Sequence, residues 1–119
     1  MKTIQIYIIE DSVEYPEALK FEIEVPLNNL GINPEFIHRV NDNTLEQDLF
    51  VGVDLILIDY DLGEINGDTI IAKIDSFPDH KSTKIIFYSG GESVESLRQK
   101  TISYSVICTT KNDLAEKII

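Results

Sequence analysis

The sequence predicts an α/β domain in which five parallel strands are covered by helices on both faces. Short apolar runs alternate with helix-like segments along all 119 residues, the pattern of repeated βα units. The run Leu55 to Ile58 is continuously apolar and branched, as in strands that are buried on both faces. The length suits one domain, so we assign residues 1–119 to a single unit.

The first strand is predicted over residues 4–9, and a helix is expected from about residue 15 to residue 30. Ser12 is a candidate N-cap for this helix, and Gly31 is a suitable stop signal. Pro26 lies inside the segment and has no N–H to donate, so it should kink or break the helix.

The middle of the chain continues the alternation. A second strand is centred on Phe36 and Ile37, and a polar turn precedes a short helix with Leu45 and Leu49 on one face. The next helix has isoleucines at inward-facing intervals. The predicted segments are strand 34–40, helix 44–50, strand 54–59 and helix 68–77.

The last third supplies two more strands. Residues 84–88 (KIIFY) form a buried strand after a polar connector over 78–83, and residues 104–108 form the fifth strand. A weak helix is expected from residue 93 to about residue 100, and a short one over 113–119. The sequence has no internal repeat, linker or low-complexity segment.

Composition excludes several functional classes. With 10 basic and 21 acidic residues the formal charge is −11, which argues against direct nucleic-acid binding and favours Mg²⁺ or a basic protein partner. No run approaches the roughly 20 apolar residues of a membrane helix. Cys108 is the single cysteine, so an intrachain disulfide is ruled out. The cytoplasm is the simplest compartment for such a chain.

Polar side chains follow the predicted strands. Because the carboxyl ends of parallel strands share one edge of the sheet, these side chains should converge where open α/β folds bind ligands. Clustered carboxylates repel one another unless a cation joins them, and Mg²⁺ is bound by such oxygens. A hydroxyl and an ammonium beside them suit a tetrahedral oxyanion next to a nucleophilic carboxylate, which we take to be Asp59. The candidates are Glu10, Asp11, Asp59, Asp61, Ser89 and Lys111.

With these residues the sequence resembles the receiver domains of two-component response regulators, the CheY-like superfamily. The resemblance extends along nearly the whole chain. The acidic pair after the first strand of that family is matched by Glu10 and Asp11, and the phosphoacceptor aspartate by Asp59. A glycine eight positions later is matched by Gly67. Ser89 and Lys111 match the Ser/Thr and Lys that end the fourth and fifth strands. The resemblance implies a flavodoxin-like sheet with strand order 2-1-3-4-5.

The resemblance also implies a Mg²⁺ site. Asp11 would bind the ion directly and Glu10 through water, while Asp59 adds a carboxylate oxygen and Asp61 a backbone carbonyl. Mg²⁺ is the one cofactor implied.

The resemblance implies phosphoryl transfer to Asp59 from a phosphohistidine on a sensor histidine kinase or a phosphotransfer protein, or from a small donor. Lys111 would pair with a phosphoryl oxygen, and Ser89 would move to hydrogen-bond another. The domain would signal to an output partner rather than act as an enzyme, apart from its own phosphorylation and dephosphorylation. It would need no nucleic acid or membrane, and it could form a homodimer.

Four positions depart from the family pattern. Leu62 and Gly63 stand where Met-Pro is common, and Cys108 stands where an aromatic usually precedes the lysine by three positions. Asn112 replaces the proline that usually follows the lysine, a change expected to aim Lys111 less firmly.

Three alternatives stay open. A Toprim-like Mg²⁺-dependent nuclease module would use Glu10 with Asp59 and Asp61, but it leaves Ser89 and Lys111 unexplained. A phosphatase of the haloacid dehalogenase type also uses an Asp-x-Asp, yet its nucleophile usually follows the first strand. The third alternative is a receiver-like domain that binds partners without being phosphorylated.

Overall fold

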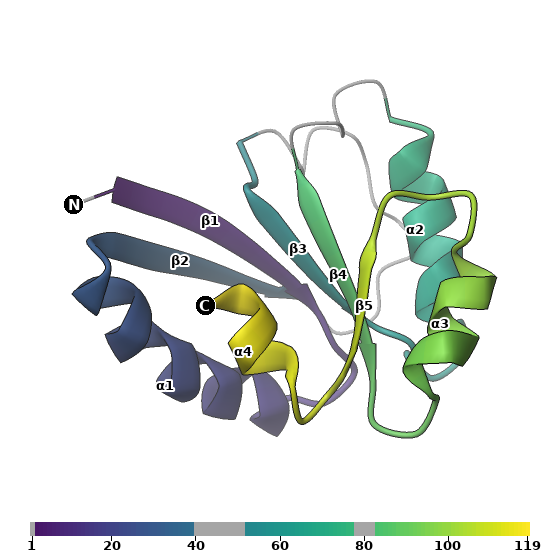
Figure 1. Cartoon of the computed structure of the whole chain (residues 1–119), viewed down its shortest axis with the longest axis horizontal. Helices are drawn as coiled ribbons and strands as arrows, with labels where there is room; N and C mark the ends of the chain where they lie inside the picture. Colours follow the sequence, from purple (N-terminus) through teal and green to yellow (C-terminus); the bar gives the residue numbers. More distant parts are fainter. Residues whose placement is uncertain (1, 40–51, 78–82) are drawn as a thin grey trace.

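A computed structural model describes residues 2–39, 52–77 and 83–119 and shows one five-stranded parallel sheet (Figure 1). The strand order is β2-β1-β3-β4-β5, which confirms the predicted fold class and strand order. The strands are β1 (Lys2–Ile9), β2 (Ile32–Arg39), β3 (Leu55–Asp59), β4 (Lys84–Ser89) and β5 (Ile107–Thr110).

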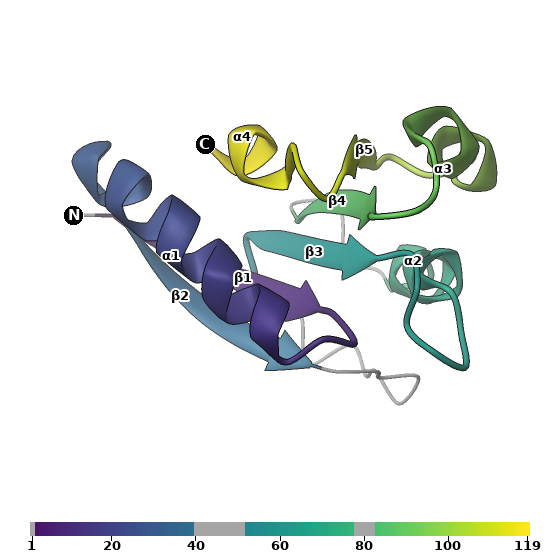
Figure 2. The ribbon, with the colours of Figure 1, turned by 90° about the horizontal axis from the view of Figure 1, so that it is seen from below.

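Helices cover both faces of the sheet. They are α1 (Glu14–Asn29), α2 (Gly67–Asp75), α3 (Val94–Lys100) and α4 (Leu114–Ile118). Figure 2 shows α1 and α4 on one side of the sheet and α2 and α3 on the other. Among the described residues, no helix is both long and apolar enough to cross a membrane.

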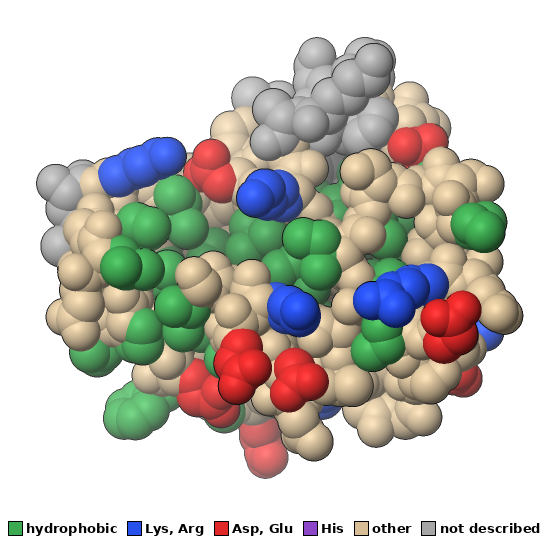
Figure 3. Space-filling model, viewed as in Figure 1, with side chains coloured by type: hydrophobic (Ala, Val, Ile, Leu, Met, Phe, Trp, Pro, Cys, Tyr) green, Lys and Arg blue, Asp and Glu red, His purple; other side chains and the backbone are tan. Residues whose placement is uncertain are grey.

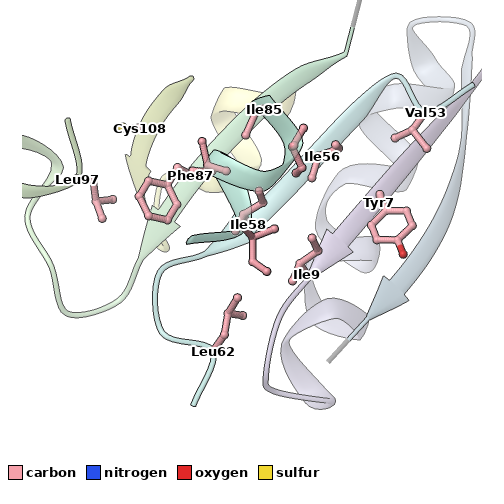
Figure 4. Close-up of a cluster of buried hydrophobic side chains, with 13 residues drawn as sticks. Tyr7, Ile9, Val53, Ile56, Ile58, Leu62, Ile85, Phe87, Leu97 and Cys108 are labelled. Atoms are coloured by element: carbon pink, nitrogen blue, oxygen red, sulfur yellow. The ribbon is translucent and has the colours of Figure 1, made fainter. Parts of the chain in front are cut away.

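The strand side chains divide into two apolar cores because successive residues of a strand point to opposite faces. Leu55 and Leu57 of β3 join the core beneath α1 and α4, whereas Ile56 and Ile58 join the core beneath α2 and α3. In the second core, Ile9, Ile58 and Phe87 extend from three adjacent strands toward the same interior (Figure 4). This two-sided burial explains why the β3 run is continuously apolar.

Helix α1 continues through Pro26 to Asn29, so of the predicted kink or break at this proline the break is wrong. Leu19, Ile23 and Leu27 recur at helical spacing and are fully buried against the sheet, which outweighs the loss of one backbone hydrogen bond. The outer surface of α1 is partly apolar, because Phe21 is 86% exposed. Figure 3 shows hydrophobic side chains over this helix.

Element boundaries differ from the prediction mainly at the fifth strand. The prediction placed it over 104–108, whereas β5 spans Ile107–Thr110. Tyr104 and Val106 are partly buried against the α2/α3 core without being strand residues. Their apolar side chains at alternate positions therefore resembled a strand in the sequence. The helix predicted over 44–50 and most of the connector over 78–83 lie outside the described residues.

Candidate functional site

The site begins with a row of side chains across the carboxyl ends of the strands. Ile9 of β1 pairs with Ile58 of β3, so Glu10 and Asp59 come next in the same register. Asp59 in turn pairs with Tyr88 of β4, and Tyr88 pairs with Thr109 of β5. Alternation along each strand directs this row to the face that carries α1 and α4. Two carboxylates are therefore neighbours because of strand register.

The six predicted site residues line one open hollow of about 740 Å³ at this edge of the sheet. Three of them, Glu10, Asp59 and Ser89, are buried, whereas Asp11 and Asp61 are exposed. The complete lining is Glu10, Asp11, Ser12, Asp59, Tyr60, Asp61, Asn66, Ser89, Gly90, Gly91, Glu92 and Lys111. The structure thus brings together all the candidates from separate strand ends.

Glu10 is the most enclosed acid of the hollow, with 1% of its surface exposed. Its Oε1 atom accepts hydrogen bonds from the Lys111 ammonium (3.1 Å) and the Tyr88 hydroxyl (3.2 Å). Its Oε2 atom accepts a bond from the backbone N–H of Ser12 (2.9 Å). Three donors from three parts of the chain therefore fix this carboxylate.

Asp59 has fewer compensating contacts. Burial, followed by the negative charge of Glu10, raises the pKa of Asp59 from 3.8 to about 7, although the Lys111 ammonium opposes the shift. The backbone N–H of Asp61 points to Oδ1 of Asp59 at 3.4 Å, a long and weak bond. The Asp59 carboxylate is thus poised between its charged and neutral forms near neutral pH.

Tyr15, in the first turn of α1, holds Lys111 from a second direction. The Lys111 ammonium lies 4.2 Å from the centre of the Tyr15 ring, and the Tyr15 hydroxyl donates to the Lys111 carbonyl oxygen at 3.3 Å. The helix start that carries this ring is fixed by Ser12, whose hydroxyl accepts from the Tyr15 N–H at 3.2 Å. These contacts orient Lys111 although the residue after it is Asn112 and not the proline of the family pattern.

The hydroxyl of Ser89 is turned toward the loop that follows β4. Its Oγ atom accepts hydrogen bonds from the N–H groups of Gly91 (3.1 Å) and Glu92 (2.9 Å). The hydroxyl proton is not used in these two bonds and can be donated elsewhere. Ser89 therefore combines a fixed oxygen with an available donor at the rim of the hollow.

Gly67 sets how closely α2 approaches the end of β3. Its N–H donates to the Tyr60 carbonyl at 2.7 Å. A Cβ at this position would lie 2.2 Å from the Asp59 carbonyl oxygen, 2.8 Å from Phe87 and 2.9 Å from Ile58. This contact explains the glycine eight residues after Asp59, because any side chain there would displace the strand that carries the acid.

Acidic residues make up much of the lining of the hollow, and their carboxylate oxygens are ligands that Mg²⁺ takes in proteins. Within residues 2–39, 52–77 and 83–119, no group of three His, Cys, Asp or Glu side chains is already arranged around a common metal position. Glu10 is directed to Lys111 and Tyr88 instead. Lys111 offsets only part of the repulsion between Glu10 and Asp59, and a cation would relieve the rest, so the chemistry of the site fits a hard divalent ion.

Sequence reasoning missed Tyr88 and Tyr15. Tyr88 was expected only as part of a buried strand, yet its hydroxyl reaches past Asp59 to Glu10. The available signal was its position directly before Ser89 at a strand end, where a buried tyrosine needs a partner for its hydroxyl. The charge of Glu10 adds to burial in raising the pKa of Tyr88 above its usual range.

No family model matches the chain, and no curated protein sequence matches it. Solved structures do match. The receiver domain of a DNA-binding response regulator from Colwellia psychrerythraea superposes with a TM-score of 0.75 at 19% identity, covering 97% of this chain and 94% of that one.

Two further neighbours carry information about ligands or partners of their own. The Mn²⁺-bound response regulator Rcp1 has a TM-score of 0.69 at 21% identity, covering 97% of this chain and 88% of its own. The receiver domain of Saccharomyces cerevisiae Ssk1, solved with the histidine phosphotransfer protein Ypd1, has a TM-score of 0.69 at 18% identity, covering 98% and 87%. This chain therefore has the CheY-like, flavodoxin-like fold of response-regulator receiver domains.

Proposed function

We propose that this domain accepts a phosphoryl group on Asp59 and so switches a partner-binding surface, as a signalling domain of a two-component system. One observation carries the proposal: the buried Asp59 carboxylate shares a hollow with the Lys111 ammonium and the Ser89 hydroxyl. The fold of receiver domains supports the same conclusion.

In the transfer step, an Asp59 carboxylate oxygen attacks the phosphorus of a phosphohistidine. A P–O bond forms, the P–N bond breaks, and its electron pair leaves with the imidazole. Lys111 then pairs with one phosphoryl oxygen and Ser89 donates its hydroxyl proton to another. Asp59 must be ionised to attack, and its pKa of about 7 means that a nearby cation would increase the reactive fraction at neutral pH.

Mg²⁺ is the cation that we propose. The carboxylates of Asp11 and Asp59 and the Asp61 carbonyl would hold it, with Glu10 acting through water. When bound, it would neutralise the acids and the phosphoryl oxygens. The description of the Rcp1 neighbour as Mn²⁺-bound supports a divalent ion at such a site.

The phosphoryl donor is proposed to be a sensor kinase or a phosphotransfer protein. The Ssk1 neighbour was solved with a histidine phosphotransfer protein, which supports this class of partner. In this role the domain stores one phosphoryl group rather than turning over a substrate, so it is a signalling domain and not an enzyme.

Intact mass after incubation with acetyl phosphate and Mg²⁺ tests the proposal. The wild type should gain one phosphoryl group, and Asp59→Asn should gain none. Asp61→Asn is a matched control, because it changes an exposed acid of the same hollow and leaves the backbone carbonyl unchanged; it should still be modified.

The same experiment separates the alternatives. A Toprim-like nuclease would leave its own mass unchanged and would nick plasmid DNA in Mg²⁺. A domain that only binds partners would do neither. Either result would remove Asp59 from the role of phosphoacceptor.

A further inference from the structure

Tyr88 joins the apolar core to the candidate site. Its ring is fully buried beneath α1 and α4 and packs beside the Tyr15 ring, with 5.9 Å between the ring centres. Its hydroxyl leaves this apolar surrounding and donates to Oε1 of Glu10 at 3.2 Å. The hydroxyl therefore occupies one defined position next to the acidic row.

The oxygen that Tyr88 binds is the one that also holds Lys111. The ammonium of Lys111 lies 3.1 Å from Oε1 of Glu10, so two donors converge on one carboxylate oxygen. With 1% of Glu10 exposed, bulk solvent has little access to that oxygen. If the ammonium left and nothing else donated, a buried charged oxygen would lose its partner, which is costly.

The proposed function, on which this inference rests, requires that movement. Lys111 must turn from Glu10 toward a phosphoryl oxygen on Asp59, the residue between Glu10 and Tyr88 in the row. We infer that Tyr88 is a positioning residue: its hydroxyl keeps Oε1 of Glu10 hydrogen-bonded after Lys111 leaves, and so makes the lysine available to the phosphoryl group. The hydrogen bond of the Tyr88 hydroxyl goes to Glu10, so Tyr88 acts on the reaction through Glu10 and Lys111.

The test uses beryllofluoride, a non-covalent phosphoryl mimic, with Mg²⁺ held at saturation for each variant. Binding is followed by the amide chemical shifts of Ser89 and Gly90. Tyr88→Phe removes only the hydroxyl, so Glu10 then depends on Lys111 alone at Oε1. We expect the beryllofluoride midpoint to rise about tenfold, the effect of one hydrogen bond to a charged group.

Two controls separate positioning from packing. Tyr7→Phe removes a hydroxyl from a buried tyrosine in the opposite core, and its midpoint should stay within about twofold of the wild type. In a Glu10→Gln background no carboxylate holds the ammonium, so adding Tyr88→Phe should change the midpoint by less than about twofold. If Tyr88→Phe raised the midpoint only by disturbing the packing, the same rise would also appear in the Glu10→Gln background.

Hydrogen exchange of the Tyr88 hydroxyl proton tests the inference in the wild-type protein alone. The Tyr88 hydroxyl proton should be protected from exchange with water in the free protein and should remain protected with beryllofluoride bound. Loss of protection on binding would overturn the inference.

An unchanged midpoint in Tyr88→Phe, an equal loss in Tyr7→Phe, or a full loss in the Glu10→Gln background would overturn the role of Tyr88 alone. A wild type that ignores beryllofluoride would overturn the phosphoacceptor function, and this inference with it.

Discussion

Replacing Gly67 with alanine tests how closely α2 must approach the end of β3. The added Cβ would lie 2.2 Å from the Asp59 carbonyl oxygen, 2.8 Å from Phe87 Cε1 and 2.9 Å from Ile58 Cγ2. Real Cβ atoms are not found this close to such neighbours. The nearest atom belongs to the backbone of a central strand, so it cannot rotate away as a flexible side chain would.

We expect Gly67→Ala to lower the free energy of unfolding strongly, whereas helix propensity alone would predict no loss. Gly67 is the first residue of α2, where alanine would otherwise be as good as glycine or better. Overpacking of a core usually costs about 1–3 kcal/mol, and a clash with backbone belongs at the upper end, so we expect about 3 kcal/mol. For a domain of this size that corresponds to a melting temperature lower by about 12 °C.

Urea and thermal unfolding followed by far-ultraviolet circular dichroism measure this change. Gly91→Ala is the matched control, because a Cβ there meets no atom within 4 Å, and its stability should stay within about 0.5 kcal/mol of the wild type. If Gly67→Ala lost less than about 1 kcal/mol, the packing of α2 against β3 would be looser than the structure shows and the steric reasoning would be refuted.

Three further predictions concern charge and the first helix. The pKa of Asp59 is raised from 3.8 to about 7, so the folded state binds more protons than the unfolded state between these pH values, and stability should fall as pH rises through this window. Asp59→Asn should therefore be more stable than the wild type at pH 8, by up to about 4 kcal/mol for a shift of about three pKa units, and this difference should disappear near pH 4. Urea unfolding at both pH values measures the difference, and a difference that does not change with pH would show that the pKa shift is absent. Mg²⁺ at about 100 times its dissociation constant should stabilise the wild type by about 2.7 kcal/mol at pH 7.5 and Asp59→Asn far less, with equal gains in calorimetry counting against Asp59 as a ligand. Pro26→Ala should raise the free energy of unfolding by about 1 kcal/mol by restoring a backbone donor inside α1, and a loss of stability would show that the proline is needed for packing.

Burial explains which strands could be predicted from the sequence. β3 and β4 lie at the centre of the sheet and are buried on both faces, so they read as continuous apolar runs. β5 was misplaced because Thr109 and Thr110 are polar in composition yet belong to the strand, while Tyr104 and Val106 are apolar yet precede it. Pairing partners decide such a boundary, and a single sequence does not display them.

The candidate site was more predictable than the strand ends. Acids directly after two apolar runs, followed by Ser89 and Lys111, converge for a topological reason that needs no side-chain detail. The contact of Tyr88 was not predictable, because it depends on which residues share a row across the strands. The contacts of Tyr15 depend on how the start of α1 lies against Lys111, which a single sequence does not show. Only the register shows that the Tyr88 hydroxyl is within reach of Glu10.

The distribution of the site over the sheet has a consequence for how the chain acquires its chemistry. Glu10 follows β1, Asp59 ends β3, Ser89 ends β4 and Lys111 follows β5, so no fragment shorter than residues 10–111 contains the whole set. A chain that had assembled only its first four strands would already hold two carboxylates in adjacent register without the ammonium that offsets them. Addition of the final strand would thus correct the charge balance and complete the reactive group in the same event.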